Sequence, residues 1–290
     1  MLTTQQAMQL LRTDIQMRGF SKNTLRVYTA YTEAFLKFCN RPVEQLDEMD
    51  ARRFLWHLTK EKKRKPSTVN LYNAAIRFFF GVTLNRTMNY LQMPRMKKAK
   101  TLPVILSRAE IGTIINNCDN IKHKALLFTA YGSGLRVSEL VNLKVNDIDS
   151  KSMRVFVSGG KGQKDRYTIL SENALRVLRD YWRRYRPKSP DGYLFPGSKN
   201  IGHLDGKTVW CLMKEAAEKS NLDKSISPHT LRHCFATHLL EDGYSLLQIK
   251  EMLGHSSIQS TTIYLHLADT TVGVISPADK MSVNFEKCPL

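Results

Sequence analysis

Apolar residues recur three or four positions apart in four segments of the first ninety residues. The segments lie before Gly19, from Ser21 to Cys39, after Asp50 and after Ser67. Such spacing puts the apolar side chains on one face of a helix, and Ser21 is of a residue type that commonly caps a helix N-terminus. We therefore predict a four-helix unit at the N-terminal end of the chain.

Helical spacing returns beyond residue 104, where a single β signal interrupts it. Apolar and polar residues alternate on both sides of the glycine-rich SGGKGQ, which predicts a β-hairpin over residues 153–170. Ser227 and Pro228, followed later by Gly243, are typical of a helix with both ends specified. The pattern predicts helices through KALLFTAYGSG and VSELVNL, and near residues 171–185, 207–220, 228–241, 245–253 and 257–267.

Residues 93–103, MPRMKKAKTLP, contain two prolines, four basic residues and little periodicity. That composition is typical of an extended cationic linker. A chain of 290 residues also exceeds the roughly 150 residues of a typical domain. We therefore predict a helical domain over 1–92, a basic linker over 93–103 and a second domain over 104–290. The expected fold class is mainly α, with a C-terminal α+β domain that holds a small antiparallel sheet.

The composition, 42% apolar and 24% charged residues, is that of an ordinary folded protein and excludes wholesale disorder. No stretch approaches the roughly 18 uninterrupted apolar residues of a membrane-spanning helix. The N-terminus shows no basic region followed by an apolar block, as a secretory signal would. We expect a cytoplasmic protein with no membrane partner.

Basic residues greatly outnumber acidic ones, since 44 Lys and Arg against 26 Asp and Glu give a net charge of +18. The excess is concentrated in residues 1–100, which hold 19 basic and 7 acidic residues. A polyanion binds such a surface with release of counterions, so nucleic acid is the expected partner. A merely soluble basic surface is the alternative.

Two runs of basic residues are candidates for phosphate contacts. The run KEKKRK, residues 60–65, lies between two predicted helices, and the linker supplies the other. The candidate DNA-binding residues are Lys62, Lys63, Arg64, Lys65, Lys97, Lys98 and Lys100. We favour a phosphate clamp for residues 60–65 over a simple solvated loop, because the whole first domain shares the charge excess.

The five cysteines lie far apart and form no CxxC pair, which supports neither a disulfide framework nor a Cys-type zinc site. His229 and His233 have the i, i+4 spacing of a helical zinc motif, but Thr230 stands where a metalloprotease has glutamate. Arg232 would also place a positive charge beside the ion. We therefore expect no metal.

Four motifs in the second domain, GLRVSEL, GGKGQKDR, HTLRH and LGHSSIQSTTIY, combine cations, histidines and a tyrosine. In chain order their candidate residues are Arg136, Glu139, Lys161, His229, Arg232, His255 and Tyr264. Singly, each has an ordinary interpretation, such as a structural ion pair, an exposed turn lysine or a core tyrosine. The remaining candidates, His233, His238 and His266, are interpreted as packing or solvent-facing residues.

Together, the order Arg, hairpin Lys, His-x-x-Arg, Gly-His and Tyr resembles the tyrosine recombinase (phage integrase) family, in particular its Xer and integron-integrase members. HTLRHCFATHLL and GLRVSEL are its most specific motifs in this chain. By the resemblance, the catalytic set is Arg136, Lys161, His229, Arg232, His255 and Tyr264. Its tyrosine would be the nucleophile, and Glu139 would have a supporting role. The N-terminal helices would form a SAM-like core-binding domain.

The resemblance implies site-specific recombination of double-stranded DNA by a homotetramer, through a 3′-phosphotyrosyl bond and a Holliday junction. The chemistry of the residues agrees, because two arginines can hold the non-bridging phosphate oxygens while a cation-stabilised phenolate attacks phosphorus. No cofactor is needed, and a related recombinase is a further candidate partner. A type IB topoisomerase and a catalytically silent DNA-binding regulator are the alternatives. The biological role stays open between chromosome resolution, integration and transposon movement.

The 26 residues after Tyr264 form a tail that includes Val272, Val274 and Ile275. These side chains would be costly to leave exposed as a patch. We predict that the tail docks on a neighbouring protomer.

Overall fold

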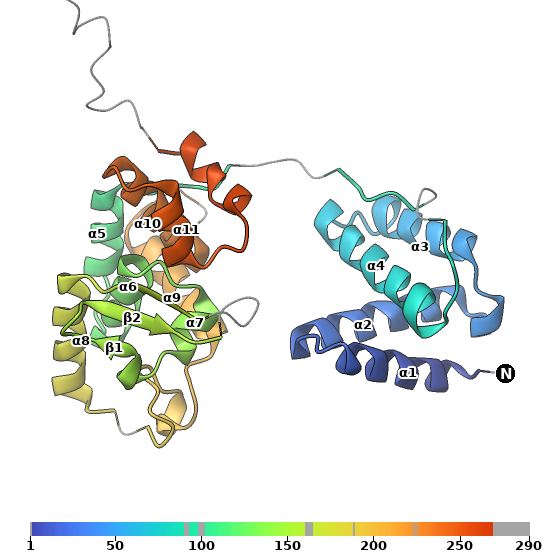
Figure 1. Ribbon diagram of the computed structural model, residues 1–290, viewed down its shortest axis with the longest axis horizontal. Coiled ribbons are helices and arrows are strands. Elements are labelled where there is room, and N and C mark those ends of the chain that lie inside the picture. Colours follow the sequence, from blue (N-terminus) through green and yellow to red (C-terminus); the bar gives the residue numbers. More distant parts are fainter. Residues whose placement is uncertain are drawn as a thin grey trace, which may run out of the picture. The chain divides into compact units, whose positions relative to one another are not determined.

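The computed structural model describes residues 2–89, 93–97, 102–159, 165–187, 189–222, 224 and 226–268. The chain divides into two compact units, Met1–Thr101 and Leu102–Leu290 (Figure 1). The division falls inside the segment 93–103, whose role as a linker stays a prediction. Among the described residues, no helix is long and apolar enough to span a bilayer.

The described part of the first unit is helical, as its apolar spacing predicts. Its elements are α1 (Thr4–Met17), α2 (Lys22–Cys39), a 3₁₀ helix (Val43–Gln45), α3 (Glu48–Lys60), α4 (Pro66–Phe78) and a π-helical turn, Phe79–Thr83. Ser21 caps α2 by accepting a hydrogen bond from the Thr24 amide, as predicted. α3 begins earlier than its apolar residues indicate, because Asp47 and Asp50 form a capping box.

Aromatic side chains pack these helices together, while the basic loop between α3 and α4 is exposed. α2 packs against α1, α3 and α4. The Phe35 ring lies 5.6 Å from the Phe54 ring and 6.0 Å from the Phe80 ring, centroid to centroid. Residues 61–65 connect α3 to α4, and all five are exposed, as is Lys60 at the end of α3. The first unit therefore presents its densest basic run to solvent.

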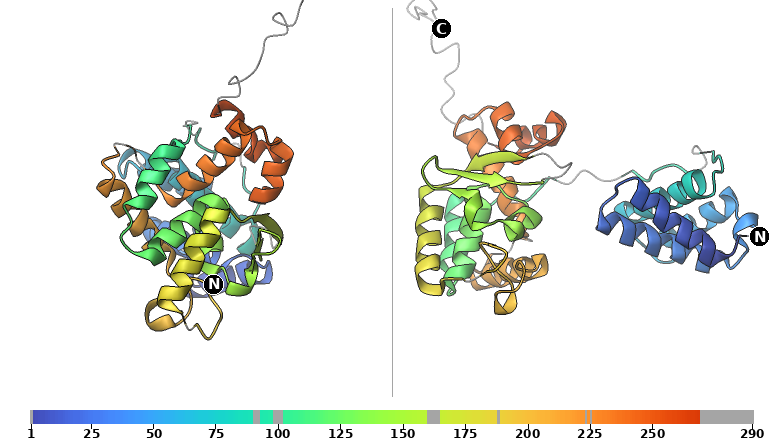
Figure 2. Two further views of the ribbon diagram at one scale, coloured as in Figure 1. Left: turned by 90° about the vertical axis from the view of Figure 1, so that its left-hand side faces the viewer. Right: turned by 60° about the horizontal axis from the view of Figure 1, so that its bottom comes forward.

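The second unit is mainly helical around its own apolar core. Its helices are α5 (Arg108–Asn116), α6 (Ile121–Gly132), α7 (Val137–Asn142), α8 (Glu172–Tyr185), α9 (Gly206–Lys219), α10 (Pro228–Glu241) and α11 (Leu246–Leu253). α6 and α8 lie side by side, and α10 also packs on α6 (Figures 1 and 2). α10 begins at Pro228 with Ser227 as its N-cap, as predicted, and Gly243 with φ +88° lies just beyond its end.

A small antiparallel sheet of order β1-β2-β3 confirms the predicted hairpin and adds one strand. The strands are β1 (Ile148–Asp149), β2 (Arg154–Val157) and β3 (Arg166–Ile169). β1 was not predicted, because two residues are too few to show alternation. The hairpin tip, residues 160–164, lies outside the described residues. α11 packs beside β3, which brings the end of the chain's helical part to the sheet (Figure 2).

The prediction of one helix over 257–267 is wrong. Two 3₁₀ helices, Ile258–Ser260 and Thr262–His266, occupy this segment. The Ser257 hydroxyl accepts from the Gln259 amide, and the Thr262 hydroxyl donates to the Gln259 carbonyl. These local side-chain bonds compete with α-helical ones, and the β-branched run from Thr261 to Ile263 further lowers helix propensity.

Candidate active site

Arg136 and Glu139 form an ion pair at the start of α7. Arg136 is the N-cap residue, and its Nη1 donates to Glu139 Oε1 at 2.6 Å. The Arg136 amide donates to Glu139 Oε2 at 2.8 Å. The Glu139 side chain is only 5% exposed, whereas that of Arg136 is 20% exposed. The GLRVSEL motif thus places a buried carboxylate under a guanidinium that still reaches solvent.

Gly134 shapes the approach to this pair. Its φ is +60°, and a Cβ atom at this position would lie 2.3 Å from the Phe235 ring. Only glycine adopts this backbone and tolerates this contact without displacement. The Gly134 carbonyl in turn accepts a hydrogen bond from Arg232 Nη1 at 2.7 Å. The glycine therefore lets α10 pack against the turn that precedes Arg136.

Arg232 lies on α10 and is buried, with 4% of the residue exposed. Its Nη2 donates to the Leu253 carbonyl at 2.5 Å, and its Nη1 lies 3.6 Å from Glu139 Oε2. Burial and the neighbouring Arg136 cation lower the pKa of Arg232 to about 9, so the guanidinium stays charged at pH 7. Its carbonyl partners and Glu139 offset the cost of burying that charge.

A third arginine, Arg166, also binds Glu139. Its Nη1 and Nη2 donate to the two carboxylate oxygens at 2.9 and 2.7 Å. Although burial acts to raise the pKa of Glu139, hydrogen bonds from Arg166 and Arg136 hold it at about 2. Sequence reasoning missed Arg166. The sequence holds no clear signal for it, because alternation along β3 puts the apolar Tyr167 and Ile169 on the face opposite Arg166. In the structure those two residues are exposed and Thr168 is buried.

The candidate nucleophile, Tyr264, lies in the Thr262–His266 3₁₀ helix and is 1% exposed. Burial raises the pKa of its phenol, while the cations of Arg232 and Arg136 act in the opposite direction. His255 stacks on its ring at 6.5 Å between centroids, with 13° between the planes. The phenol therefore lies within the electrostatic influence of both candidate catalytic arginines.

His233 is the second residue that sequence reasoning missed. Its Nδ1 lies 3.2 Å from the Tyr264 hydroxyl, and burial together with the nearby His229 and Arg232 lowers its pKa. From the sequence, His233 is predicted to pack or to face solvent, and its i, i+4 spacing to His229 is related only to a zinc motif. That spacing does place both rings on one face of α10, toward the same site.

The two predicted histidines take different positions. His229 is exposed in the first turn of α10, with its ring centroid 6.5 Å from that of Trp210. Partial burial and the cations of Arg232 and Arg136 lower its pKa. His255 hydrogen-bonds Thr261 Oγ1 through Nδ1 at 2.9 Å. Burial and Arg232 lower the pKa of His255 to about 4, so its ring is neutral at pH 7.

None of the remaining candidate catalytic or DNA-binding residues lies among the described residues of the second unit. Lys161, Lys98 and Lys100 lie outside the described residues. Lys97 is exposed, as are Lys62, Lys63, Arg64 and Lys65 in the α3–α4 loop. No group of three or more His, Cys, Asp or Glu side chains is arranged for a metal ion in the part of the chain that the structure describes.

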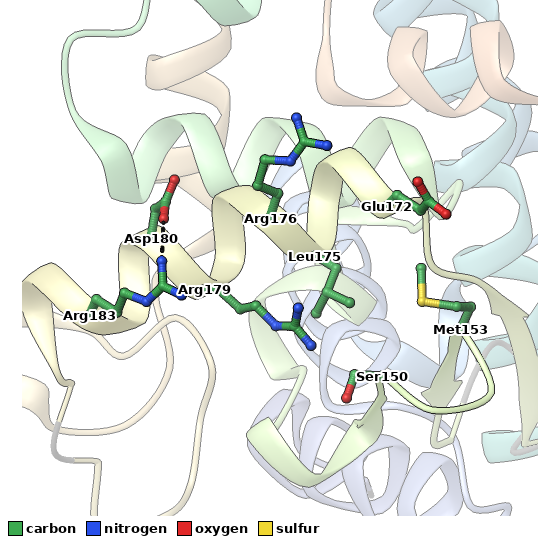
Figure 3. Close-up of a pocket in the computed structure, with 8 residues that line it drawn as sticks. All are labelled: Ser150, Met153, Glu172, Leu175, Arg176, Arg179, Asp180 and Arg183. Carbon is green, nitrogen blue, oxygen red and sulfur yellow. Dashed lines mark hydrogen bonds and ion pairs between the residues drawn. The ribbon is translucent and has the colours of Figure 1, made fainter.

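A cavity of about 420 Å³ in the second unit is separate from this cluster (Figure 3). Figure 3 shows that arginines of α8 line it, and that one of them, Arg183, pairs with Asp180. Its lining residues are Ser150, Met153, Glu172, Leu175, Arg176, Arg179, Asp180 and Arg183. None of the candidate catalytic residues lies among them, so this cavity is not the candidate site.

Two family models match the chain. A model described as the phage integrase family matches residues 104–271, which include every candidate catalytic residue. A model described as the phage integrase N-terminal SAM-like domain matches residues 8–90. The two matches divide the chain between them.

Individual relatives match over most of their length. The putative integrase/recombinase y4qK of Sinorhizobium fredii is 41% identical over 265 residues, which cover 91% of this chain and 85% of the relative. The tyrosine recombinase XerA of Pyrococcus furiosus is 38% identical over 257 residues, which cover 87% of this chain and 86% of the relative.

Solved structures agree in fold. An XerA recombinase matches with a TM-score of 0.55 and 28% identity, covering 92% of this chain and 95% of that one. A lambda integrase dimer bound to a COC′ core site matches with a TM-score of 0.72 and 18% identity, and the match covers 90% of this chain and 77% of that one. The second likeness concerns the fold alone.

Proposed function

Because the chain belongs to the phage integrase family and is a tyrosine-type site-specific DNA recombinase, we propose that Tyr264 attacks a DNA phosphate held by Arg136 and Arg232. The observation that carries this proposal is the pair of contacts made by two adjacent residues of α10. Arg232 faces the Glu139 carboxylate, and His233 contacts the Tyr264 hydroxyl. One helix therefore connects the cationic pocket to the nucleophile.

The two arginines bind the non-bridging oxygens of the scissile phosphate. Arg136 reaches solvent while Glu139 fixes its position, and Arg232 is held by the Gly134 and Leu253 carbonyls. Guanidiniums fixed in this way need no reorganisation when negative charge develops on the phosphate oxygens. They therefore stabilise the pentacovalent transition state more than the bound diester.

Tyr264 forms the covalent intermediate. Its phenol oxygen forms a bond to phosphorus, the bond from phosphorus to the 5′ oxygen breaks, and a 3′-phosphotyrosyl link remains. Religation reverses these steps with a 5′ hydroxyl as the attacking group. Since Tyr264 is 1% exposed in the DNA-free chain, cleavage requires the Thr262–His266 segment to shift toward the phosphate. A short 3₁₀ helix is suited to such a shift.

Two proton transfers accompany the attack. His233 accepts the phenol proton, because its Nδ1 is 3.2 Å from the hydroxyl and its lowered pKa keeps the ring neutral at pH 7. Lys161 protonates the departing 5′ oxygen. His229 and His255, also neutral, donate hydrogen bonds to the phosphate. Every bond broken and every proton moved then has a named partner in the chain, and no cofactor takes part.

The basic loop and linker bind the DNA backbone. Residues 62–65 are exposed between α3 and α4, and Lys97 is exposed in the segment that follows. Such lysines and arginines contact phosphates without reading base sequence. Residues 93–103, with Lys98 and Lys100, link a SAM-like domain over 1–92 to a catalytic domain over 104–290.

Recombination needs two DNA sites and four cleavages, so the working assembly is a homotetramer on two duplexes that passes through a Holliday junction. A related recombinase can replace two of the protomers. The setting is cytoplasmic and nucleoid-associated, on a chromosome or a mobile element. The names of two relatives, a tyrosine recombinase XerA and a putative integrase/recombinase, support recombination as the activity that such an assembly would carry out.

Covalent trapping tests the proposal. The full-length protein is incubated with a library of nicked, randomised duplexes, in which loss of a short strand prevents religation. We expect adducts that survive denaturant and that disappear in Tyr264→Phe, which lacks only the phenol oxygen. Tyr244→Phe, at an exposed tyrosine of the same unit, should leave them unchanged. Adducts that persist in Tyr264→Phe would assign the nucleophile elsewhere.

A further inference from the structure

Arg166 is a buried cation to which the mechanism above gives no role. It is the first residue of β3, and its side chain is 8% exposed. Besides its two bonds to Glu139, its Nε donates to the Met252 carbonyl at 2.8 Å. One planar guanidinium therefore joins the hairpin, the α7 carboxylate and the end of α11. Such a fork has a fixed geometry that a flexible ammonium group cannot reproduce.

The contact with α11 continues into the turn that carries His255. Gly254 has a φ of +63°, and a Cβ atom there would lie 2.8 Å from Arg166 Cδ. The turn at Gly254 therefore packs directly against the aliphatic part of the Arg166 side chain. The next residue is His255, whose ring stacks on Tyr264. A displacement of Arg166 would therefore alter the support of His255.

The contact with Glu139 continues to the phosphate-binding arginines. Both carboxylate oxygens of Glu139 accept hydrogen bonds from Arg166. Arg136 Nη1 lies 2.6 Å from Glu139 Oε1, whereas Arg232 Nη1 lies farther away, 3.6 Å from Oε2. Without Arg166, the buried carboxylate would lack its bidentate partner and would draw Arg232 toward itself. A guanidinium withdrawn in this way stabilises phosphate charge less, because the interaction falls with distance.

We propose that Arg166 is a positioning residue for strand cleavage, which holds Glu139 and the Met252–His255 turn so that Arg136, Arg232 and His255 meet the scissile phosphate. This inference rests on the proposed roles of those residues. Arg166 acts through its protein contacts and not on the DNA.

The test compares cleavage of two nicked duplexes, one with an ordinary scissile phosphate and one with a methylphosphonate at that position. The methylphosphonate lacks one charged non-bridging oxygen and so depends less on well-placed arginines. For Arg166→Gln we expect about 10²-fold slower single-turnover cleavage of the phosphate, as for a misplaced or lost oxyanion contact. The ratio of phosphate to methylphosphonate rates should fall at least about tenfold, with DNA affinity changed by less than about threefold.

Arg166→Lys and Arg154→Gln are the matched variants. Lysine keeps the charge and one contact with Glu139, so Arg166→Lys should recover part of the rate ratio. Arg154, exposed on the neighbouring strand β2, should leave both rates unchanged when it is replaced. If Arg166→Gln proves unfolded at the assay temperature, Arg166→Lys carries the same comparison.

Equal slowing of both substrates, with an unchanged ratio, would show that Arg166 only stabilises the fold and would overturn the inference. Wild-type rates in Arg166→Gln would do so as well. Failure of the proposed function looks different, because Tyr264→Phe would then still form the adduct. An inactive Tyr264→Phe with an unchanged rate ratio in the Arg166 variants rejects only the role of Arg166.

Discussion

Replacing Glu139 with glutamine should destabilise the second unit by about 3 kcal/mol at pH 7. The carboxylate is 5% exposed and accepts hydrogen bonds from Arg136 and Arg166. Burial acts to raise its pKa, but these bonds hold it at about 2, against 4.5 for an unperturbed glutamate. At about 1.36 kcal/mol for each tenfold change in proton affinity, the difference corresponds to about 3 kcal/mol. Breaking a buried ion pair from one side commonly costs a similar amount.

Urea unfolding of the full chain measures this loss if the signal comes from the second unit alone. The chain has three tryptophans, and Trp56→Phe leaves Trp182 and Trp210, which both lie in the second unit. Glu139→Gln is then compared with its parent in that background. Glu218→Gln is the matched control, because Glu218 is exposed and pairs with Lys214 at 3.5 Å. It should change the free energy of unfolding by less than about 0.5 kcal/mol.

The pH dependence checks the cause. A carboxylate whose pKa is lowered in the folded state stabilises it fully above the unfolded pKa, here 4.5, and loses that effect as pH falls through about 2. The difference between Glu139→Gln and its parent should therefore shrink to about 2 kcal/mol at pH 3.5. A loss below about 1 kcal/mol at pH 7, or a loss that does not shrink in acid, would refute the electrostatic reasoning.

Four further predictions test the DNA contacts and the chemistry. Alanine at residues 62–65 should weaken binding across sequences and reduce the slope of log affinity against log salt by up to about 3.6, whereas an unchanged slope would identify a solvated loop. A bridging sulfur at the 5′ position should restore cleavage to Lys161→Ala but not to Tyr264→Phe, and rescue of neither would deny Lys161 the general-acid role. His233→Asn keeps a hydrogen-bond acceptor but lacks a basic nitrogen, so the cleavage rate should fall about 10²-fold at pH 7. The rate should recover as the pH approaches the pKa of tyrosine, and a deficit that does not depend on pH would contradict the role of His233 as the base. Truncation at Asp269 should lower strand exchange more than single-site binding, and full exchange would exclude the docking role of the tail.

Helices with local end signals were predictable from the sequence. α10 shows this best, because Ser227, Pro228 and Gly243 act on its ends within a few residues. Elements stabilised by longer-range contacts were not. The strand Ile148–Asp149 exists only through its pairing with β2, and alternation cannot be read from two residues. The 257–267 segment has helical apolar spacing, but local hydroxyl bonds and packing against α10 prevail over it.

The candidate site divides in a similar way. Arg136, Arg232 and Tyr264 are candidates from the sequence because they occur in recognisable motifs of fixed spacing. Arg166 and His233 were missed because their roles depend on partners far along the chain, 27 residues away for Glu139 and 31 for Tyr264. The i, i+4 spacing of His229 and His233 was visible as a pattern, whereas alternation along β3 points to Tyr167 and Ile169 as the inward residues, and both are exposed. What the sequence lacked was the identity of the group on the other side of each contact.

Under the proposed mechanism, charge balance explains why these residues lie together. Arg136, Arg166 and Arg232 surround one carboxylate, so the described part of the pocket carries a formal charge of +2 while His255 is neutral. A phosphodiester brings one negative charge, and the attacking phenolate adds a second, so the pentacovalent transition state approaches −2. Because the proposed mechanism passes the phenol proton to His233, the negative charge beside the arginines grows from the bound diester to the transition state while their own charge stays fixed. This difference stabilises the transition state selectively, which catalysis requires, and it depends on Glu139 neutralising no more than one of the three arginines.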